Sequence, residues 1–153
     1  MTKNVQCKYG FFKLVFAGVL FVALLAGCAS GPKYQDMANT IPALAPGQGR
    51  IVFYRPSSIG AGIRPVIYLN DEMVGTSKSW GFFFVDRSAG NYTARVTSET
   101  ENKISFVLEA GETKYLRCSP SLGVFVYRIV ISLETPEKAK EELPSLHYTG
   151  NDD

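Results

Sequence analysis

The chain has 153 residues, of which 46% are hydrophobic, 12% aromatic and 20% charged. This composition provides for one folded domain and excludes an intrinsically disordered chain. The formal net charge is +2, but the charged residues in positions 1–27 are three lysines, Lys3, Lys8 and Lys13, and the rest of the chain carries 13 basic and 14 acidic side chains. A near-neutral domain lacks the basic surface that nucleic acid requires, so we expect no nucleic acid among its partners.

Residues 1–27 have the features of a bacterial export signal. The lysines precede an uncharged apolar run, Leu14 to Gly27, which is shorter than the ~20 residues that a membrane-spanning helix needs. The run ends in Leu25-Ala26-Gly27-Cys28, which resembles a lipobox. The resemblance implies cleavage between Gly27 and Cys28 and attachment of lipid to the Cys28 thiol. The alternative is a plain secretory signal, or an uncleaved anchor, with Cys28 present by chance.

A lipid on Cys28 makes the bilayer the first partner of the mature chain. One acyl chain binds weakly, at ~0.8 kcal/mol per buried methylene, whereas two or three chains hold firmly. Ala29 and Ser30 follow the cysteine, and neither is the aspartate that resembles an inner-membrane retention signal. In a bacterium with two membranes, we therefore expect an outer-membrane lipoprotein that faces the periplasm.

The remaining chain divides into three parts. Residues 28–49 contain three prolines and three glycines without periodicity, which predicts a lipidated N-terminus followed by a flexible tether. About 20 flexible residues would span roughly 25 Å. Residues 50–134 have the alternating pattern of β-strands. Residues 135–153 open with Thr135-Pro136-Glu137, which is typical of a helix start, and we expect a short helix and then a frayed tail.

The pattern in residues 50–134 predicts an all-β fold. Ile104, Phe106 and Leu108, for example, alternate with more polar neighbours, and Asn70-Asp71 has the composition of a hairpin turn. About seven or eight short strands at this spacing predict an antiparallel β-sandwich or a small barrel. We favour the sandwich, with the short C-terminal helix packed after it.

Cysteine and histidine usage argues against an enzyme. Cys118 stands without a cysteine partner in the mature domain, on the same side of a strand-like run as Leu116, which predicts a buried structural thiol. His147 is the single histidine and lies in the expected tail. It is therefore poorly placed for a catalytic triad or a zinc site. We expect no enzymatic activity, no cofactor and no metal.

An ordered set of short motifs carries a family resemblance. The set runs from Gly49 to Pro56 (GRIVFYRP) through Ile63 to Asn70 (IRPVIYLN), Met73-Val74-Gly75 and Trp80 to Phe84 (WGFFF) to Ala89 to Thr93 (AGNYT). In this order the motifs resemble the bacterial lipoprotein family known as domain of unknown function 2846 (DUF2846). The resemblance covers roughly residues 48–135. It implies a secreted β-sandwich and no assigned activity.

Two arginines are candidates for a binding site. Arg55 and Arg64 flank a loop rich in small residues, Pro56 to Ile63. Two guanidinium groups beside such a loop could hold an anionic group by bidentate hydrogen bonds. The alternative is that each arginine is an ordinary solvent-exposed charge at the end of a strand.

Aromatic side chains are the second candidate. Tyr54, Tyr68 and Trp80, together with Phe82 and Phe84, exceed what one core face usually needs. An exposed aromatic row could contact a protein partner or a sugar ring, and core packing is the alternative. We therefore expect a non-enzymatic module that binds another envelope protein through a sheet edge or an aromatic patch. The second hypothesis is a module for envelope glycan or a small anion, which would use Arg55, Arg64 and Trp80.

Overall fold

The computed structural model describes residues 31–97, 101–123 and 127–150. The leader, Gly27 and Cys28, for which we predict cleavage and lipidation, lie outside the described residues. In the part of the chain that is described, no helix is long and apolar enough to span a bilayer.

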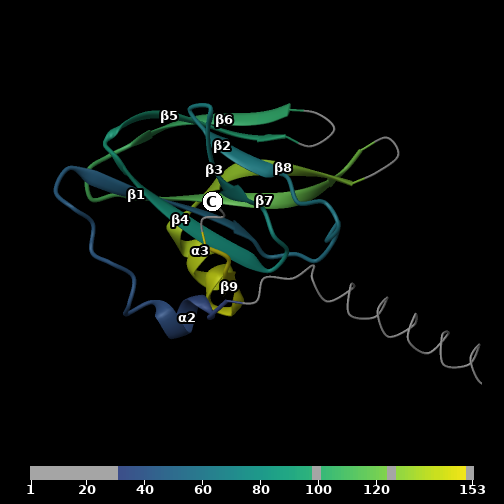
Figure 1. Cartoon of the computed structure of the whole chain (residues 1–153), viewed down its shortest axis with the longest axis horizontal. Helices are drawn as coiled ribbons and strands as arrows, with labels where there is room; N and C mark the ends of the chain where they lie inside the picture. Colours follow the sequence, from purple (N-terminus) through teal and green to yellow (C-terminus); the bar gives the residue numbers. More distant parts are fainter. Residues whose placement is uncertain (1–30, 98–100, 124–126, 151–153) are drawn as a thin grey trace, which may run out of the picture.

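Two stacked β-sheets make up most of the domain (Figure 1). The five-stranded sheet has the order β8-β7-β1-β4-β9, and the four-stranded sheet has the order β3-β2-β5-β6. The strands are β1 (Gln48–Arg55), β2 (Val66–Leu69), β3 (Glu72–Thr76), β4 (Gly81–Ser88), β5 (Gly90–Thr97), β6 (Glu101–Leu108), β7 (Thr113–Leu122), β8 (Tyr127–Glu134) and β9 (His147–Tyr148). The prediction of an all-β sandwich with a short C-terminal helix is confirmed.

Two pairings in the five-stranded sheet are parallel, whereas we expected an antiparallel sandwich. β1 pairs with β7 in parallel over five residue pairs, and β9 pairs with β4 in parallel over two. The chain reaches β7 from β1 only after it has crossed twice to the four-stranded sheet, so no hairpin constrains the direction of this pair. The ladders within the four-stranded sheet are antiparallel, and Asn70-Asp71 forms the predicted turn between β2 and β3, with φ values of 47° and 67°.

The main core lies between the two sheets. Each of the strands β1–β8 contributes alternate side chains to it, as period-two patterning requires. Cys118 is 1% exposed and lies in this core with Leu116, which confirms the predicted buried thiol.

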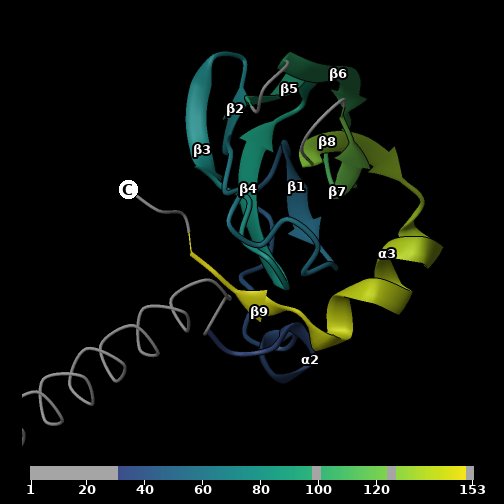
Figure 2. The same cartoon turned by 90° about the vertical axis from the view of Figure 1, so that its right-hand side faces the viewer.

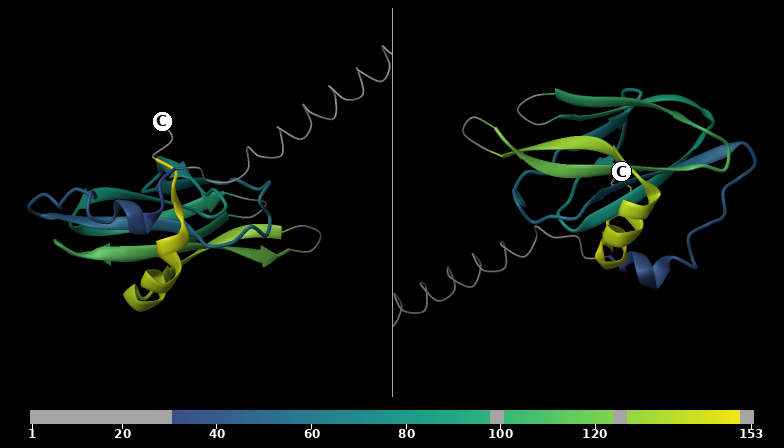
Figure 3. Two further views of the ribbon diagram at one scale, coloured as in Figure 1. Left: turned by 90° about the horizontal axis from the view of Figure 1, so that it is seen from below. Right: turned by 180° about the vertical axis from the view of Figure 1, so that it is seen from behind.

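The five-stranded sheet is also covered on its other face. α2 (Tyr34–Met37), α3 (Pro136–Glu142) and the 3₁₀ helix η2 (Leu143–Ser145) form a covering layer there. Figure 2 and Figure 3 show these helices on the side of the five-stranded sheet that faces away from the four-stranded sheet. The buried members of this second core are Val52, Tyr54, Phe82, Ala139, Leu143 and Leu146.

Residues 31–49 are part of the fold, so the prediction of a flexible tether is wrong for these residues. The backbone N–H of Tyr34 donates to the Leu146 carbonyl at 2.9 Å. The Tyr34 ring meets the Phe82 ring edge-on, with 5.2 Å between their centroids. These tertiary contacts hold a segment whose proline and glycine content alone indicates a linker.

Residues 146–149 of the expected tail likewise pair instead of fraying, and residues 151–153 lie outside the described residues. The N–H of His147 donates to the Trp80 carbonyl at 2.9 Å, and the N–H of Tyr148 donates to the Pro32 carbonyl at 2.8 Å. A Cβ on Gly31 would overlap the Tyr148 carbonyl oxygen, so the two segments pack too closely there for a side chain at this position. The two ends of the described chain therefore meet at β9.

Candidate functional site

Arg55, which we expected to contact an anion, is buried inside the domain. Its side chain is 1% exposed. Nη2 donates to the carbonyl oxygens of Ile59 and Gly60, each at 2.8 Å. Nη1 donates to the carbonyl oxygen of Ile63 at 2.7 Å and to that of Ser77 at 3.5 Å. The hydrogen bonds of this guanidinium thus go to the protein's own backbone, and the expectation of an external ligand on Arg55 is wrong.

The Arg55 guanidinium organises the loop of residues 56–65. A planar fork of donors can satisfy several carbonyl groups that a loop without regular structure leaves unpaired. Burial lowers the pKa of the Arg55 guanidinium and the nearby Cys118 acts against this, but arginine starts from so high a value that it remains charged. Gly60, at φ +71°, takes a backbone conformation that favours glycine.

Arg64 and Arg55 do not form one site. Arg64 is exposed in the same loop, whereas Arg55 points into the protein. The two arginines flank one loop, as their positions in the sequence indicate. The ligand chemistry that we assigned to the pair does not follow, because the Arg55 side chain is buried and both of its Nη atoms donate to backbone carbonyl groups.

The aromatic side chains expected to form one exposed row are separated. Tyr54 is 2% exposed and lies with Phe82 in the second core, and Phe84 packs against the same core. Tyr68 is half-buried on the other sheet, and Trp80 is 40% exposed just before β4. A sheet buried on both faces needs apolar side chains in both directions, so the apparent surplus of aromatic residues fills a second core.

The thiol and the imidazole are both engaged in structural roles. Burial raises the pKa of the Cys118 thiol to about 11, although Ser77 and Arg55 act against it, so the thiol is protonated at neutral pH. Nδ1 of His147 donates to the Gly31 carbonyl at 2.6 Å. Among the residues that the structure describes, no three His, Cys, Asp or Glu side chains gather in an arrangement that could hold a metal ion.

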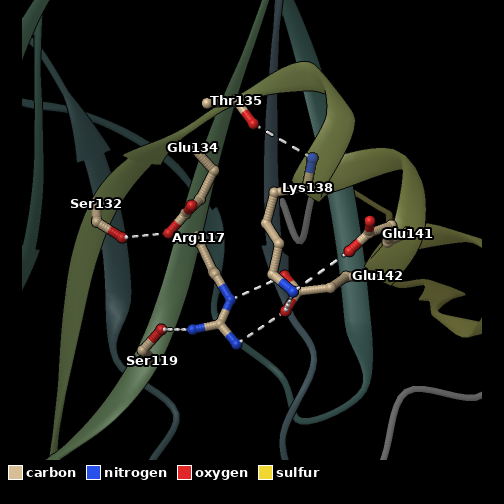
Figure 4. A network of polar contacts seen from close by, with 8 residues as sticks. All are labelled: Arg117, Ser119, Ser132, Glu134, Thr135, Lys138, Glu141 and Glu142. Atoms are coloured by element: carbon tan, nitrogen blue, oxygen red, sulfur yellow. Dashed lines mark hydrogen bonds and ion pairs between the residues drawn. The ribbon is translucent and has the colours of Figure 1, made fainter.

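A network of charged side chains fastens α3 to β7 (Figure 4). Arg117 donates from Nε and Nη2 to the two carboxylate oxygens of Glu142, at 2.9 and 3.1 Å. Lys138 lies 3.6 Å from the same carboxylate. Thr135 caps the helix as predicted, because its Oγ1 accepts the Lys138 N–H at 3.3 Å.

The charge states in this network are fixed near neutral pH. Burial acts to raise the pKa of Glu142, but the hydrogen bonds and charge of Arg117, with the charge of Lys138, outweigh it, so the pKa lies below its ordinary value. Burial and then the neighbouring Glu142 raise the pKa of the Tyr54 hydroxyl well above its ordinary value. At neutral pH, a charged carboxylate beside a neutral phenol is suited to holding a helix in place and poorly suited to proton transfer.

The outer face of the four-stranded sheet is a different environment, since no described helix or strand covers it (Figure 1). Tyr68 and Arg95 are cross-strand partners, and the Arg95 guanidinium lies over the Tyr68 ring at 4.2 Å. Arg95 is also 3.4 Å from Asp71 and 3.8 Å from Glu101. An open hollow of about 740 Å³ lies on this face and is lined by Asn70, Asp71, Thr93, Arg95, Glu101 and Lys103.

Sequence reasoning missed Arg95. The alternation of residues 92–98 does place Arg95 opposite the core-facing Ala94 and Val96. Its contact with Tyr68, however, depends on the register between β2 and β5, which only the folded sheet reveals.

Replacing Arg55 with lysine tests its role in the loop. Arg55→Lys keeps the charge but puts all donors on one nitrogen, so the carbonyl groups on the two sides of the guanidinium cannot all be satisfied. We expect the free energy of unfolding to fall by at least about 2 kcal/mol. The matched exposed change, Arg64→Lys, should stay within about 0.5 kcal/mol. Equal small effects in urea denaturation would contradict this role.

Glu142 should contribute to stability in a pH-dependent way. Because its pKa is lowered by folding, its carboxylate stabilises the folded state above the ordinary glutamate pKa of about 4.3, and this contribution is lost as the pH falls through the lower folded value. Glu142→Gln should lower the free energy of unfolding at pH 7 by about 1–2 kcal/mol. The difference from wild type should shrink in acid. Glu141→Gln, on the solvent side of the same helix, is the control; a pH-independent difference for Glu142→Gln would refute the account.

Comparisons with known proteins agree with the family resemblance. The family described as "Protein of unknown function (DUF2846)" matches residues 45–129. A protein of Haemophilus influenzae, described as uncharacterized, is 27% identical over 145 residues, which cover 90% of this chain and 86% of the relative. No solved structure matches the chain. The chain therefore belongs to the DUF2846 family, whose function is unknown.

Proposed function

We propose that this chain is a lipid-anchored lipoprotein of the bacterial envelope that acts as a non-enzymatic interaction module. Acylated Cys28 holds it in the outer membrane, facing the periplasm. The outer face of the four-stranded sheet binds another envelope protein. The observation that carries the proposal is the stack of Arg95 on Tyr68 in the middle of this uncovered face.

The leader sequence supports the anchor. A basic start, a 14-residue apolar run and a lipobox-like ending occur in the correct order and spacing for lipidation of Cys28. Cys28 lies only three residues before Gly31, where the described chain begins against the domain. The folded part would then begin almost directly at the lipid.

The chemistry of the uncovered face supports a protein partner. Tyrosine and arginine are enriched among the residues that dominate binding energy at protein interfaces. The ion pairs of Arg95 with Asp71 and Glu101 hold its side chain in position before binding, which reduces the entropy lost on association. Met73, opposite Tyr68, and Val107, on β6, are 48% and 50% exposed and add apolar area to the same face.

The nucleophile and base that a hydrolase would need are poorly provided. The Cys118 thiol is buried and protonated, and His147 donates to a backbone carbonyl. These observations favour binding over catalysis as the work of the domain.

A module for envelope glycan or a small anion is the second candidate. The observation that favours it is the hollow of about 740 Å³, where Arg95 and Lys103 supply positive charge and Asn70 and Thr93 supply hydrogen-bonding groups. One face of the Tyr68 ring is already covered by Arg95, which leaves less of the ring to stack on a sugar. We therefore favour the protein partner.

Photo-crosslinking in living cells tests the binding face. A photoreactive amino acid at Ser105, exposed on β6, should give an adduct with one envelope protein, and Arg95→Ala should abolish it. The same probe at Lys140, exposed on α3, is the control and should give no such adduct. Equal adducts from the two positions, or none from Ser105, would contradict the proposed face.

Two further measurements separate the remaining parts of the proposal. Cys28→Ser should release the chain from the membrane fraction; retention of this variant would overturn the lipid anchor. Calorimetry with soluble peptidoglycan fragments tests the second candidate, and binding that is lost in Arg95→Ala would favour the glycan over the protein partner.

A further inference from the structure

One end of the sandwich exposes large apolar side chains, and we call it the apolar end. It consists of Ile59, Trp80, Leu122 and Tyr127, which are 51%, 40%, 73% and 44% exposed. Ile59 lies in the loop between β1 and β2, Trp80 precedes β4, and Leu122 and Tyr127 are register partners where β7 ends and β8 begins. Scattered single apolar residues are ordinary on a surface, whereas a group at one end indicates a contact.

The loops that carry these residues are held together. Arg55 donates both to Ile63, in the loop of Ile59, and to Ser77, in the segment that leads to Trp80. Gly60 lies against Tyr127, because a Cβ on this glycine would be 3.7 Å from the Tyr127 Cβ. The apolar end is therefore one structured surface.

Trp80 adopts a backbone conformation that disfavours its own side chain. Its φ is +54°, in the left-handed region where bulky residues are rare and glycine or asparagine is at ease. The side chain is nevertheless 40% exposed, so burial offsets only part of this strain. A tryptophan that stability alone would not select at this position indicates a role at the surface.

The four segments that carry the apolar end are basic. Residues 56–65, 76–80, 119–123 and 127–128 contain Arg64, Lys78 and Arg128 and no acidic residue, whereas Glu101, where β6 begins at the same end of the sandwich, lies within 4.0 Å of Arg95 and Lys103. At the opposite end, the turns of residues 70–72 and 109–112 contain four acidic residues, one of which, Glu72, is paired with Arg87 at 3.0 Å. α3 carries charges of both signs.

The chain leaves the domain close to the apolar end. Gly31 lies against Tyr148 in β9, and β9 pairs with the first residues of β4, directly after Trp80. Two residues, Ala29 and Ser30, separate Gly31 from Cys28, and the three Cα-to-Cα steps can span at most about 10 Å. A lipid on Cys28 would therefore start within that distance of the Gly31 backbone, instead of at the end of a long tether.

We propose that the apolar end rests on the phospholipid surface. Trp80 and Tyr127 suit the interfacial zone, Ile59 and Leu122 enter the acyl-chain boundary, and the basic residues meet anionic headgroups. The inference rests on the proposed anchor at Cys28 and adds an orientation to it. With this end on the bilayer, the outer face of the four-stranded sheet stays accessible to a partner.

The single tryptophan of the chain reports this contact directly. The mature lipidated protein, purified from membranes and reconstituted in vesicles of phosphatidylethanolamine and phosphatidylglycerol, should show Trp80 emission at shorter wavelength than the folded Cys28→Ser variant in buffer without lipid. Lipids brominated near the headgroup end of the acyl chain should quench this emission more strongly than lipids brominated near the chain terminus. Vesicle flotation of the same samples measures anchoring separately.

Two double variants with similar exposure make the test specific. Ile59→Ser with Leu122→Ser should lose most of the quenching and still float with the vesicles. Met73→Ser with Val107→Ser changes two half-exposed side chains on the four-stranded sheet and should be quenched like wild type. Wild-type unfolding temperatures for both pairs would exclude misfolding as the cause, and single Leu122→Ser replaces the first pair if that pair unfolds early.

Three results would overturn the inference. If the wild-type protein floats but its Trp80 is not quenched, the apolar end does not contact the bilayer, although the lipid anchor is intact. Crosslinked dimers in that sample would show that the apolar end binds a second copy of the chain. Equal quenching in both double variants would show that Ile59 and Leu122 do not hold the end on lipid. Failure of the wild-type chain to float would remove the anchor at Cys28, and the docking inference with it.

Discussion

The five-stranded sheet carries large apolar side chains on both faces, and the rest of the structure depends on covering them. The four-stranded sheet buries one face, while Tyr54 and Phe82 on the other face need a second cover. Burial of one such side chain contributes about 1.5–3 kcal/mol, and typical domains have a net stability of only about 5–15 kcal/mol. The covering layer is therefore required for folding, and the segments at both ends of the described chain supply it.

This requirement also determines where the protein can be attached. α2 and η2 lie on the same face of the five-stranded sheet. The first described residues therefore lie beside β9, and Gly31 and Tyr148 are in contact. A sequence that suggests a long tether instead provides two residues between Cys28 and Gly31, where the described fold begins. A lipid on Cys28 would restrict the orientation of the domain, so that the surface near the anchor and the surface that binds a partner would be different parts of the molecule.

Local patterns in the sequence predict the parts of this structure that local physics determines. Alternation predicts the strands, Asn70-Asp71 the hairpin turn, and Thr135 the helix start. Predictions that depend on tertiary contacts fail. Proline and glycine content does not show that residues 31–49 pack on the sheet. An arginine beside a loop can bind a ligand or, as Arg55 does, the loop's own carbonyl groups. The Tyr68–Arg95 stack requires the register of two strands, which no single strand's pattern contains.

Hydrogen exchange measured by NMR tests the central claim, that the ends of the described chain are fixed parts of the covering layer. The amides to follow are those of Tyr34, bonded to Leu146, and Tyr148, bonded to Pro32. We predict that both exchange slowly, with protection approaching that of amides in β1, in the mature chain carrying Cys28→Ala. Exchange of these two amides at the rate of an exposed turn such as Ala110, while β1 stays protected, would show that the segment is a free tether and would contradict the account.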